Sequence, residues 1–162
     1  MPAGTPSQTI GPFFSIGLGG GSRGEVVDPD RAGAVRVAGV VRDGSGEPVP
    51  DALLELWQAE GCARAATGPD GGFSFVTVKP GQVRGVDGAE QAPHIAVSVF
   101  ARGLLTRLVT RIYFPDEAEA NARDPLLRGL ADAATLIARP DGGGLRFDIT
   151  LQGDGETVFL DA

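Results

Sequence analysis

The sequence contains very few of the residues that hold transition metals or act as nucleophiles. Its 162 residues include one cysteine (Cys62), one histidine (His94) and one tyrosine (Tyr113). These three residues cannot supply the ligands of a dedicated zinc or redox-metal site, and a single cysteine excludes a disulfide within the chain. A carboxylate site for Ca²⁺ or Mg²⁺ survives this count, but no D-x-[DN]-x-[DN]-G loop is present. If the chain takes part in metal chemistry, another chain must supply most of the ligands.

Basic residues and long apolar runs are scarce as well. Lys and Arg total 14 against 21 Asp and Glu, a formal net charge of −7, which argues against a nucleic-acid interface or a polybasic membrane patch. No apolar run approaches the roughly 18 residues of a membrane-spanning helix, and the N-terminus lacks the basic and apolar regions of a secretory signal. The lone cysteine fits a reducing compartment. We therefore expect a soluble, cytoplasmic protein.

Glycine, proline and short alternating apolar runs are abundant. The chain has 25 glycines and 12 prolines, and 42% of its residues are hydrophobic. Period-two alternation between turn-forming residues predicts strands, and seven strands without long helices predict a mainly β fold, an antiparallel β-sandwich with short helices. The expected strands cover residues 34–43, 52–58, 73–78, 94–101, 108–114, 144–151 and 157–160, and the expected helices lie near residues 116–121 and 130–138.

The N-terminal part of the chain differs from the rest. Residues 1–33 are interpreted as an extended arm with a glycine-rich linker, and residues 34–162 as the sandwich. The arm is apolar but has no clear period. Its Ile10, Phe13 and Phe14 must be buried, either against the chain's own domain or against a partner.

Two short motifs in the linker lack the structural context of their usual functions. Residues 19–24 match G-x-G-x-x-G and residues 20–24 match G-x-S-x-G. A dinucleotide site needs the first motif inside a βαβ unit, and a nucleophile elbow needs the second at a strand-to-helix turn. Neither context is expected here, so both matches are interpreted as chance products of a glycine-rich segment.

The expected strand at residues 94–101 carries a polar residue at each end. His94, at its start, is interpreted as a hydrogen-bonded structural residue. Arg102 follows the strand, and Gly103 allows the backbone to turn sharply. A guanidinium there is suited to a carboxylate or a planar anionic ring, because it offers forked donors and a stacking face. The alternative is a solvated rim arginine paired with a carboxylate.

Nine short segments between residues 5 and 159 carry the most specific information. They are residues 5–14 (TPSQTIGPFF), 54–59 (LELWQA), 77–81 (TVKPG), 92–95 (APHI), 100–103 (FARG), 110–114 (TRIYF), 116–121 (DEAEAN), 146–149 (RFDI) and 155–159 (GETVF). In this order they resemble the alpha chains of two-chain intradiol ring-cleaving dioxygenases. The resemblance covers nearly the whole chain and implies the β-sandwich core that the alpha and beta chains of that family share.

Most iron ligands of that family have no counterpart in this chain. The resemblance implies that a catalytic chain holds one non-haem Fe(III) through two tyrosines and two histidines. One tyrosine position falls at Val83, and the histidine pair falls at His94 and Ala96. No tyrosine lies between Gln58 and Gly72, where the other would be. Only one of four ligand positions is kept, so no metal ligand set and no catalytic residue are expected on this chain.

The same resemblance gives the arm and Arg102 a role beside a partner. It implies that a beta chain holds the Fe(III) cofactor and cleaves protocatechuate with O₂ to 3-carboxy-cis,cis-muconate, and that the alpha chain completes its pocket. Gly11, Pro12 and Phe13 would line the substrate wall, and Arg102 would lie near the bound ring. Phe13 stands where many relatives have tyrosine, so it would give only apolar or stacking contact. The alternative function is a β-sandwich binding or assembly module without an active-site role.

Overall fold

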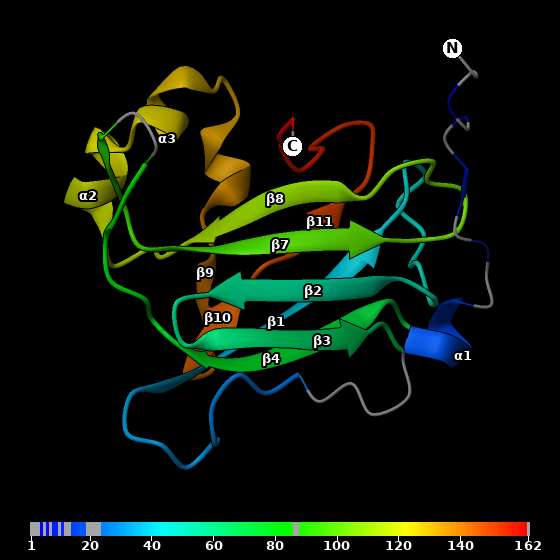
Figure 1. Cartoon of the computed structure of the whole chain (residues 1–162), viewed down its shortest axis with the longest axis horizontal. Helices are drawn as coiled ribbons and strands as arrows, with labels where there is room; N and C mark the ends of the chain where they lie inside the picture. The colour runs from blue at the N-terminus through cyan, green and yellow to red at the C-terminus, as the bar shows by residue number, and fades with distance from the viewer. Residues whose placement is uncertain are drawn as a thin grey trace.

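Two β-sheets stacked face to face form the body of the molecule (Figure 1). The computed structural model describes residues 4, 6, 8–9, 11, 14–18, 24–85 and 88–161. One sheet contains β1 (Ala34–Arg42), β4 (Gly72–Val78), β9 (Arg139–Asp141), β10 (Gly144–Arg146) and β11 (Ile149–Thr150). The other has the order β3 (Gly61–Ala66), β2 (Leu53–Gln58), β7 (His94–Phe100) and β8 (Leu108–Tyr113). A short ribbon pairs β5 (Val83–Arg84) with β6 (Glu90–Gln91).

Short helices lie at the two ends of the sandwich (Figure 1). The helix α1 (Phe14–Leu18) lies at the end toward which β7 points. The helices α2 (Ala118–Arg123) and α3 (Pro125–Gly129) lie at the opposite end, followed by the 3₁₀ helix η1 (Ala133–Leu136). No helix in the described part of the chain is long and apolar enough to cross a membrane.

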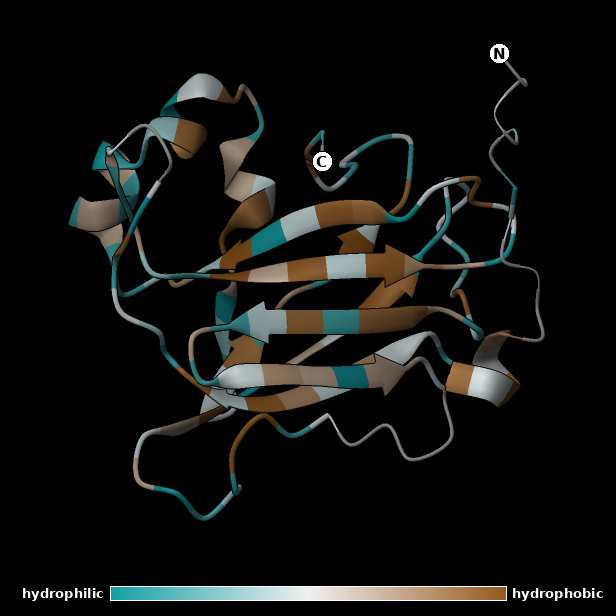
Figure 2. Cartoon of the chain, in the orientation of Figure 1, coloured by the Kyte–Doolittle hydropathy of each residue, from teal (hydrophilic) through white to brown (hydrophobic). Residues whose placement is uncertain are grey.

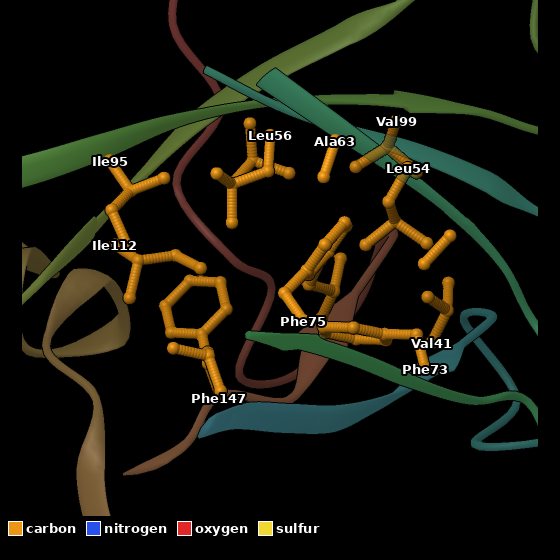
Figure 3. Close-up of a cluster of buried hydrophobic side chains, with 14 of the residues drawn as sticks. Val41, Leu54, Leu56, Ala63, Phe73, Phe75, Ile95, Val99, Ile112 and Phe147 are labelled. Carbon is orange, nitrogen blue, oxygen red and sulfur yellow. The ribbon is translucent and has the colours of Figure 1, made fainter. Parts of the chain in front are cut away.

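Alternation along the strands builds the core between the two sheets. On β2, Leu54 and Leu56 are fully buried, whereas Trp57 points to the other face and is 51% exposed. Figure 2 shows the resulting bands of hydrophobic and polar residues along the strand. On β4, Phe73 and Phe75 pack with their ring centroids 5.9 Å apart. Figure 3 shows both residues in one cluster of buried side chains with Leu54 of the facing sheet, so the core joins the two layers.

The expected mainly β sandwich is confirmed, but the sheet that holds β1 is mixed rather than antiparallel. β1 pairs antiparallel with β4 and parallel with β10 and β11. The single strand expected at residues 144–151 is divided into β10 and β11. At the division, the Asp148 carboxylate takes the place of a backbone acceptor, since it accepts the Val40 N–H at 3.0 Å. Period-two alternation carries no information on strand direction, so the sequence could not reveal the parallel pairs.

Other elements differ from the expectations as well. β3, β5, β6 and β9 form where no strand was expected. In β3 the inward residues are alanines, which give a weak apolar signal. The arm, expected to be extended, contains α1. Residues 157–160 form no strand, although the Leu160 N–H donates to the Val109 carbonyl at 2.7 Å. The helix expected at residues 130–138 is reduced to η1, and α3 precedes it.

Gly39 lies where β1 passes closest to the segment between β10 and β11. A Cβ atom at this position would lie 1.8 Å from the Phe147 carbonyl oxygen and 2.9 Å from Cζ of Phe73. Gly39→Ala should therefore lower the free energy of unfolding by about 1–3 kcal/mol, the usual range for an overpacked core. Thermal unfolding checks this, with Gly81→Ala as the control, since a Cβ at Gly81 meets nothing within 4 Å. Equal melting temperatures for the two variants would contradict the prediction.

Candidate functional site

The N-terminal arm meets the turn after β7 through one threonine. The Thr9 hydroxyl oxygen accepts a hydrogen bond from the Gly103 N–H at 3.1 Å and a longer one from the Gly11 N–H at 3.4 Å. Gly103 and Gly11 have φ angles of 86° and 72°, in the left-handed region that glycine adopts without strain. One hydroxyl thus links the arm to the turn that carries Arg102.

Arg102 lies opposite Asp51, across the pair of strands β2 and β7. Its Nε atom is 3.1 Å from Oδ2 of Asp51. The Arg102 side chain is 60% exposed and that of Asp51 is 19% exposed. No guanidinium N–H forms a hydrogen bond to another residue in the described ranges, so these donors remain available to a ligand or a partner. Sequence reasoning missed Asp51, because its pairing with Arg102 becomes visible only when the register of the two strands is known.

The guanidinium borders a surface hollow of about 520 Å³ that three loops form at this end of the sandwich. The lining residues are Asp43, Gly44, Ser45, Arg102, Gly103, Leu104, Leu151 and Gln152. The pKa of the partly exposed Asp43 carboxyl is lowered, first by the hydrogen bond from the Ser45 hydroxyl at 2.7 Å and then by the Ser45 N–H at 2.9 Å. The hollow is therefore bordered by one positive group, Arg102, and one negative group, Asp43.

The structure brings two of the four predicted substrate-binding residues together. Gly11 and Arg102 meet through the Thr9 hydroxyl, which bonds to Gly11 itself and to the residue after Arg102. Pro12 and Phe13 lie outside the described residues. Thr9 was missed by sequence reasoning, because a single threonine in an apolar arm gives no local signal of a long-range contact.

The opposite end of β7 carries the histidine. The Nδ1 atom of His94 lies 2.8 Å from the Ala92 carbonyl oxygen, and its ring centroid is 5.4 Å from that of Tyr113. The pKa of His94 is lowered, mainly because burial disfavours the imidazolium; the nearby Arg111 charge acts in the same direction. The hydrogen bond to Ala92 and the charge of Asp124 partly oppose this shift. His94 thus has the hydrogen-bonded, structural environment that its position predicted.

A buried polar network surrounds the only tyrosine. The Tyr113 hydroxyl donates to Oδ1 of Asp124 at 3.4 Å and accepts from Nη1 of Arg111 at 3.3 Å. Arg111 also donates to Oε1 of Gln91 at 3.1 Å, and the Ala92 N–H donates to Oδ2 of Asp124 at 2.8 Å. Burial is the main cause that raises the pKa of Tyr113 to about 12. This tyrosine is fully buried and engaged as a neutral phenol.

The residues at the family's iron-ligand positions do not fit a metal ion. His94 and Ala96 lie two residues apart on one face of β7, and Val83 lies on β5. Of these three side chains only the imidazole has a donor atom. The residues that the structure describes contain no group of three or more His, Cys, Asp or Glu that could hold a metal. We therefore derive no chemistry of an ion on this chain.

The two ends of β7 cannot belong to one small-molecule site. His94 begins the strand and Arg102 follows its end, eight residues further along the chain. At about 3.3 Å per residue, eight nearly extended residues span about 26 Å. The former ligand position at His94 and the turn at Arg102 are therefore separate features of the fold.

Comparison with known proteins agrees with this arrangement. No family model matches the chain. The protocatechuate 3,4-dioxygenase alpha chain of Pseudomonas putida is 41% identical over 192 aligned positions, which cover 97% of this chain and 96% of the relative. The beta chain of Burkholderia cepacia is 32% identical over 154 positions, covering 75% and 65%. A solved dioxygenase domain from Streptomyces sp. SirexAA-E superposes with a TM-score of 0.61 at 28% identity, covering 93% of this chain and 99% of that domain.

The fold and these similarities show that the chain belongs to the intradiol ring-cleavage dioxygenase family. Within that family, it is similar over nearly its whole length to the alpha chains of protocatechuate 3,4-dioxygenase. The resemblance inferred from nine short segments is thereby confirmed. The alignment with the Pseudomonas putida chain is longer than this chain, 192 positions against 162 residues, so that relative carries insertions.

The lowered pKa of His94 predicts how stability depends on pH. Below about pH 6.5 the unfolded chain takes up a proton at this residue while the folded chain does not. The free energy of unfolding should therefore fall as the pH drops from 6.5 through the lower pKa of the folded state. Because His94 is the only histidine, its proton resonances report this titration directly. A midpoint at or above 6.5 would contradict the prediction, and His94→Gln should remove this component of the pH dependence.

Proposed function

We propose that this chain is the iron-free alpha-type subunit of a two-chain protocatechuate 3,4-dioxygenase, and that it completes the substrate pocket of a beta-type partner. The partner would hold the non-haem Fe(III) and carry out O₂-dependent intradiol cleavage of protocatechuate to 3-carboxy-cis,cis-muconate. Similarity to alpha chains over 97% of the sequence is the observation that carries this proposal. The chain alone would be inactive.

The former ligand positions support a division of roles between two chains. Val83 and Ala96 offer no donor atom, and His94 binds a backbone carbonyl through Nδ1. The only tyrosine is a buried phenol within a hydrogen-bond network, whereas an iron ligand would be a phenolate. A chain with this set of side chains would depend on its partner for the metal.

The junction between the arm and Arg102 supports a role at the partner's pocket. Protocatechuate is an anion, and this chain carries a net charge of −7, so binding beside it needs a local positive group. Arg102 provides one, with guanidinium donors that no described residue satisfies by hydrogen bonding. A fixed guanidinium can bind a carboxylate through two donors, and it stabilises negative charge that develops on oxygen during a reaction. Gly11, Pro12 and Phe13 would form the apolar wall that excludes water.

One observation favours a second candidate, a β-sandwich assembly module without an active-site role. Arg102 is 60% exposed and forms an ion pair with a carboxylate, as a rim arginine does. Ion pairs of this kind contribute about 0–1 kcal/mol to stability and nothing to catalysis. The two candidates differ in what substitution of Arg102 does to turnover in the assembled enzyme.

The distribution of iron tests the division of roles. After co-expression with a beta-type chain and separation of the subunits, iron should fractionate with the beta-type chain. The isolated alpha-type chain should contain no stoichiometric iron and should not cleave protocatechuate, because three of its four ligand positions lack a ligand. Metal analysis and oxygen uptake measure both properties. Tight Fe(III) binding with a tyrosinate-to-iron colour that Tyr113→Phe abolishes would overturn the proposal.

Substitution of Arg102 tests the role at the pocket. In the assembled enzyme, Arg102→Ala should lower kcat/KM roughly tenfold to a hundredfold, because a lost charged hydrogen bond costs about 1.5–3 kcal/mol. Arg102→Lys should recover only part of this loss, since an ammonium lacks the planar fork. Iron content should stay unchanged, because neither substitution alters a metal ligand.

Arg64→Ala is the matched control for Arg102. Arg64 is 48% exposed and forms an ion pair with Glu55, a carboxylate that is mostly buried. Its substitution removes a similar charge and a similar ion pair from the same sheet, and should leave kcat/KM within about twofold. Wild-type kinetics for Arg102→Ala, or equal losses for both variants, would favour the assembly module.

A further inference from the structure

The register of β2 and β7 places a carboxylate directly opposite Arg102. In this antiparallel ladder Trp57 faces Ala96, and Leu53 faces Phe100. Two residues beyond the last pair, the same register brings Asp51 opposite Arg102, and their Oδ2 and Nε atoms lie 3.1 Å apart. Because five consecutive residue pairs fix the register, the ladder positions Asp51 relative to Arg102.

Burial makes the carboxylate the fixed member of this pair. The Asp51 side chain is 19% exposed, against 60% for Arg102. Its Oδ1 atom is buried and forms no hydrogen bond to any residue in the described part of the chain. Among those residues, Arg102 is also its only ion-pair partner. A carboxylate that is mostly buried with one charged partner constrains that partner, because moving the guanidinium away would leave the charge unpaired.

The contact with Asp51 is an ion pair that leaves the donors of the guanidinium without a hydrogen bond. The closest approach joins Nε of Arg102 and Oδ2 of Asp51 at 3.1 Å. No N–H of this guanidinium forms a hydrogen bond to another residue in the described part of the chain. A guanidinium held by an ion pair, with its N–H donors unused, offers a planar fork that matches a carboxylate or an oxyanion.

We propose that Asp51 is the positioning residue of Arg102. It holds the guanidinium by an ion pair, so that its N–H donors stay available to the pocket shared with the partner chain. This inference rests on the proposed function of Arg102. An arginine oriented before the substrate arrives loses less side-chain freedom on binding, and small errors in orientation are costly in catalysis. Asp51 acts only through Arg102 and touches no substrate.

A double-mutant cycle in the assembled enzyme tests this proposal. Asp51→Asn preserves the size of the side chain and removes its charge. It should lower kcat/KM about threefold to tenfold when Arg102 is present, and by less than about twofold in the Arg102→Ala background. Iron content should be equal in all variants. Glu55→Gln is the matched control, since Glu55 is 14% exposed and pairs with the half-exposed Arg64; it should leave kcat/KM unchanged.

Each outcome of the cycle has one meaning. Equal losses from Asp51→Asn in both backgrounds would show a general structural role and overturn the proposal, as would no loss when Arg102 is present. If Arg102→Ala alone keeps wild-type kinetics, the proposed function of Arg102 fails and the role of Asp51 fails with it; this result is visible without any Asp51 variant. If Asp51→Asn does not assemble, Asp51→Glu, which displaces the carboxylate by one methylene, should still lower kcat/KM. Wild-type kinetics for Asp51→Glu would then overturn the proposal.

Discussion

The register between β2 and β7 is the constraint on which the rest of this structure depends. It directs Leu54 and Leu56 toward the aromatic side chains of β4, so the core between the sheets forms. The same register, continued by two residues, sets Asp51 against Arg102. A slip by one residue would reverse the faces of the strand, and would disrupt the core and the candidate site together. Core stability and the direction of the arginine are therefore set by one ladder.

The two ends of β7 show how one family fold can serve different roles. The beta chain of Burkholderia cepacia, 32% identical to this chain, belongs to the same family. In this chain, the end near His94 is occupied by the network of Arg111, Tyr113 and Asp124, which satisfies its polar groups internally. Asp124 also caps α3, since its Oδ1 accepts the N–H of Leu126 at 2.9 Å. These side chains stabilise the packing of helices on the sheet and leave no set of donors for an ion.

At the other end of β7, the guanidinium N–H groups of Arg102 form no hydrogen bond to another described residue. The turn at Arg102 and Gly103 is tied to the arm by one hydroxyl and to β2 by one carboxylate. Neither contact satisfies the guanidinium N–H groups by hydrogen bonding within the described residues. The polar groups near His94 are hydrogen-bonded to one another, whereas the N–H groups of Arg102 have no hydrogen-bond partner among the described residues. This contrast is the physical basis for proposing a functional role for Arg102 rather than for His94.

Most of the long strands and the family of the protein could be predicted from the sequence. Alternation located β1, β2, β4, β7 and β8, because most of their inward residues are apolar and recur at every second position. The nine short segments identified the family. The parallel pairing of β1 could not be predicted, because parallel and antiparallel strands have the same period of two residues. β3 was missed because its inward alanines differ little in hydropathy from the residues around them.

In the candidate site, Arg102 was found because glycine after a strand end marks a turn. Thr9 and Asp51 were not found, because each acts across a contact that is distant in sequence. The most direct test of the account is a crystal structure of the co-expressed alpha–beta complex with bound protocatechuate. We predict that the iron is held by side chains of the beta-type chain alone, and that the Arg102 guanidinium, still paired with Asp51, lies within contact distance of the bound ring. Arg102 facing solvent, with the arm packed only on its own sandwich, would contradict the account.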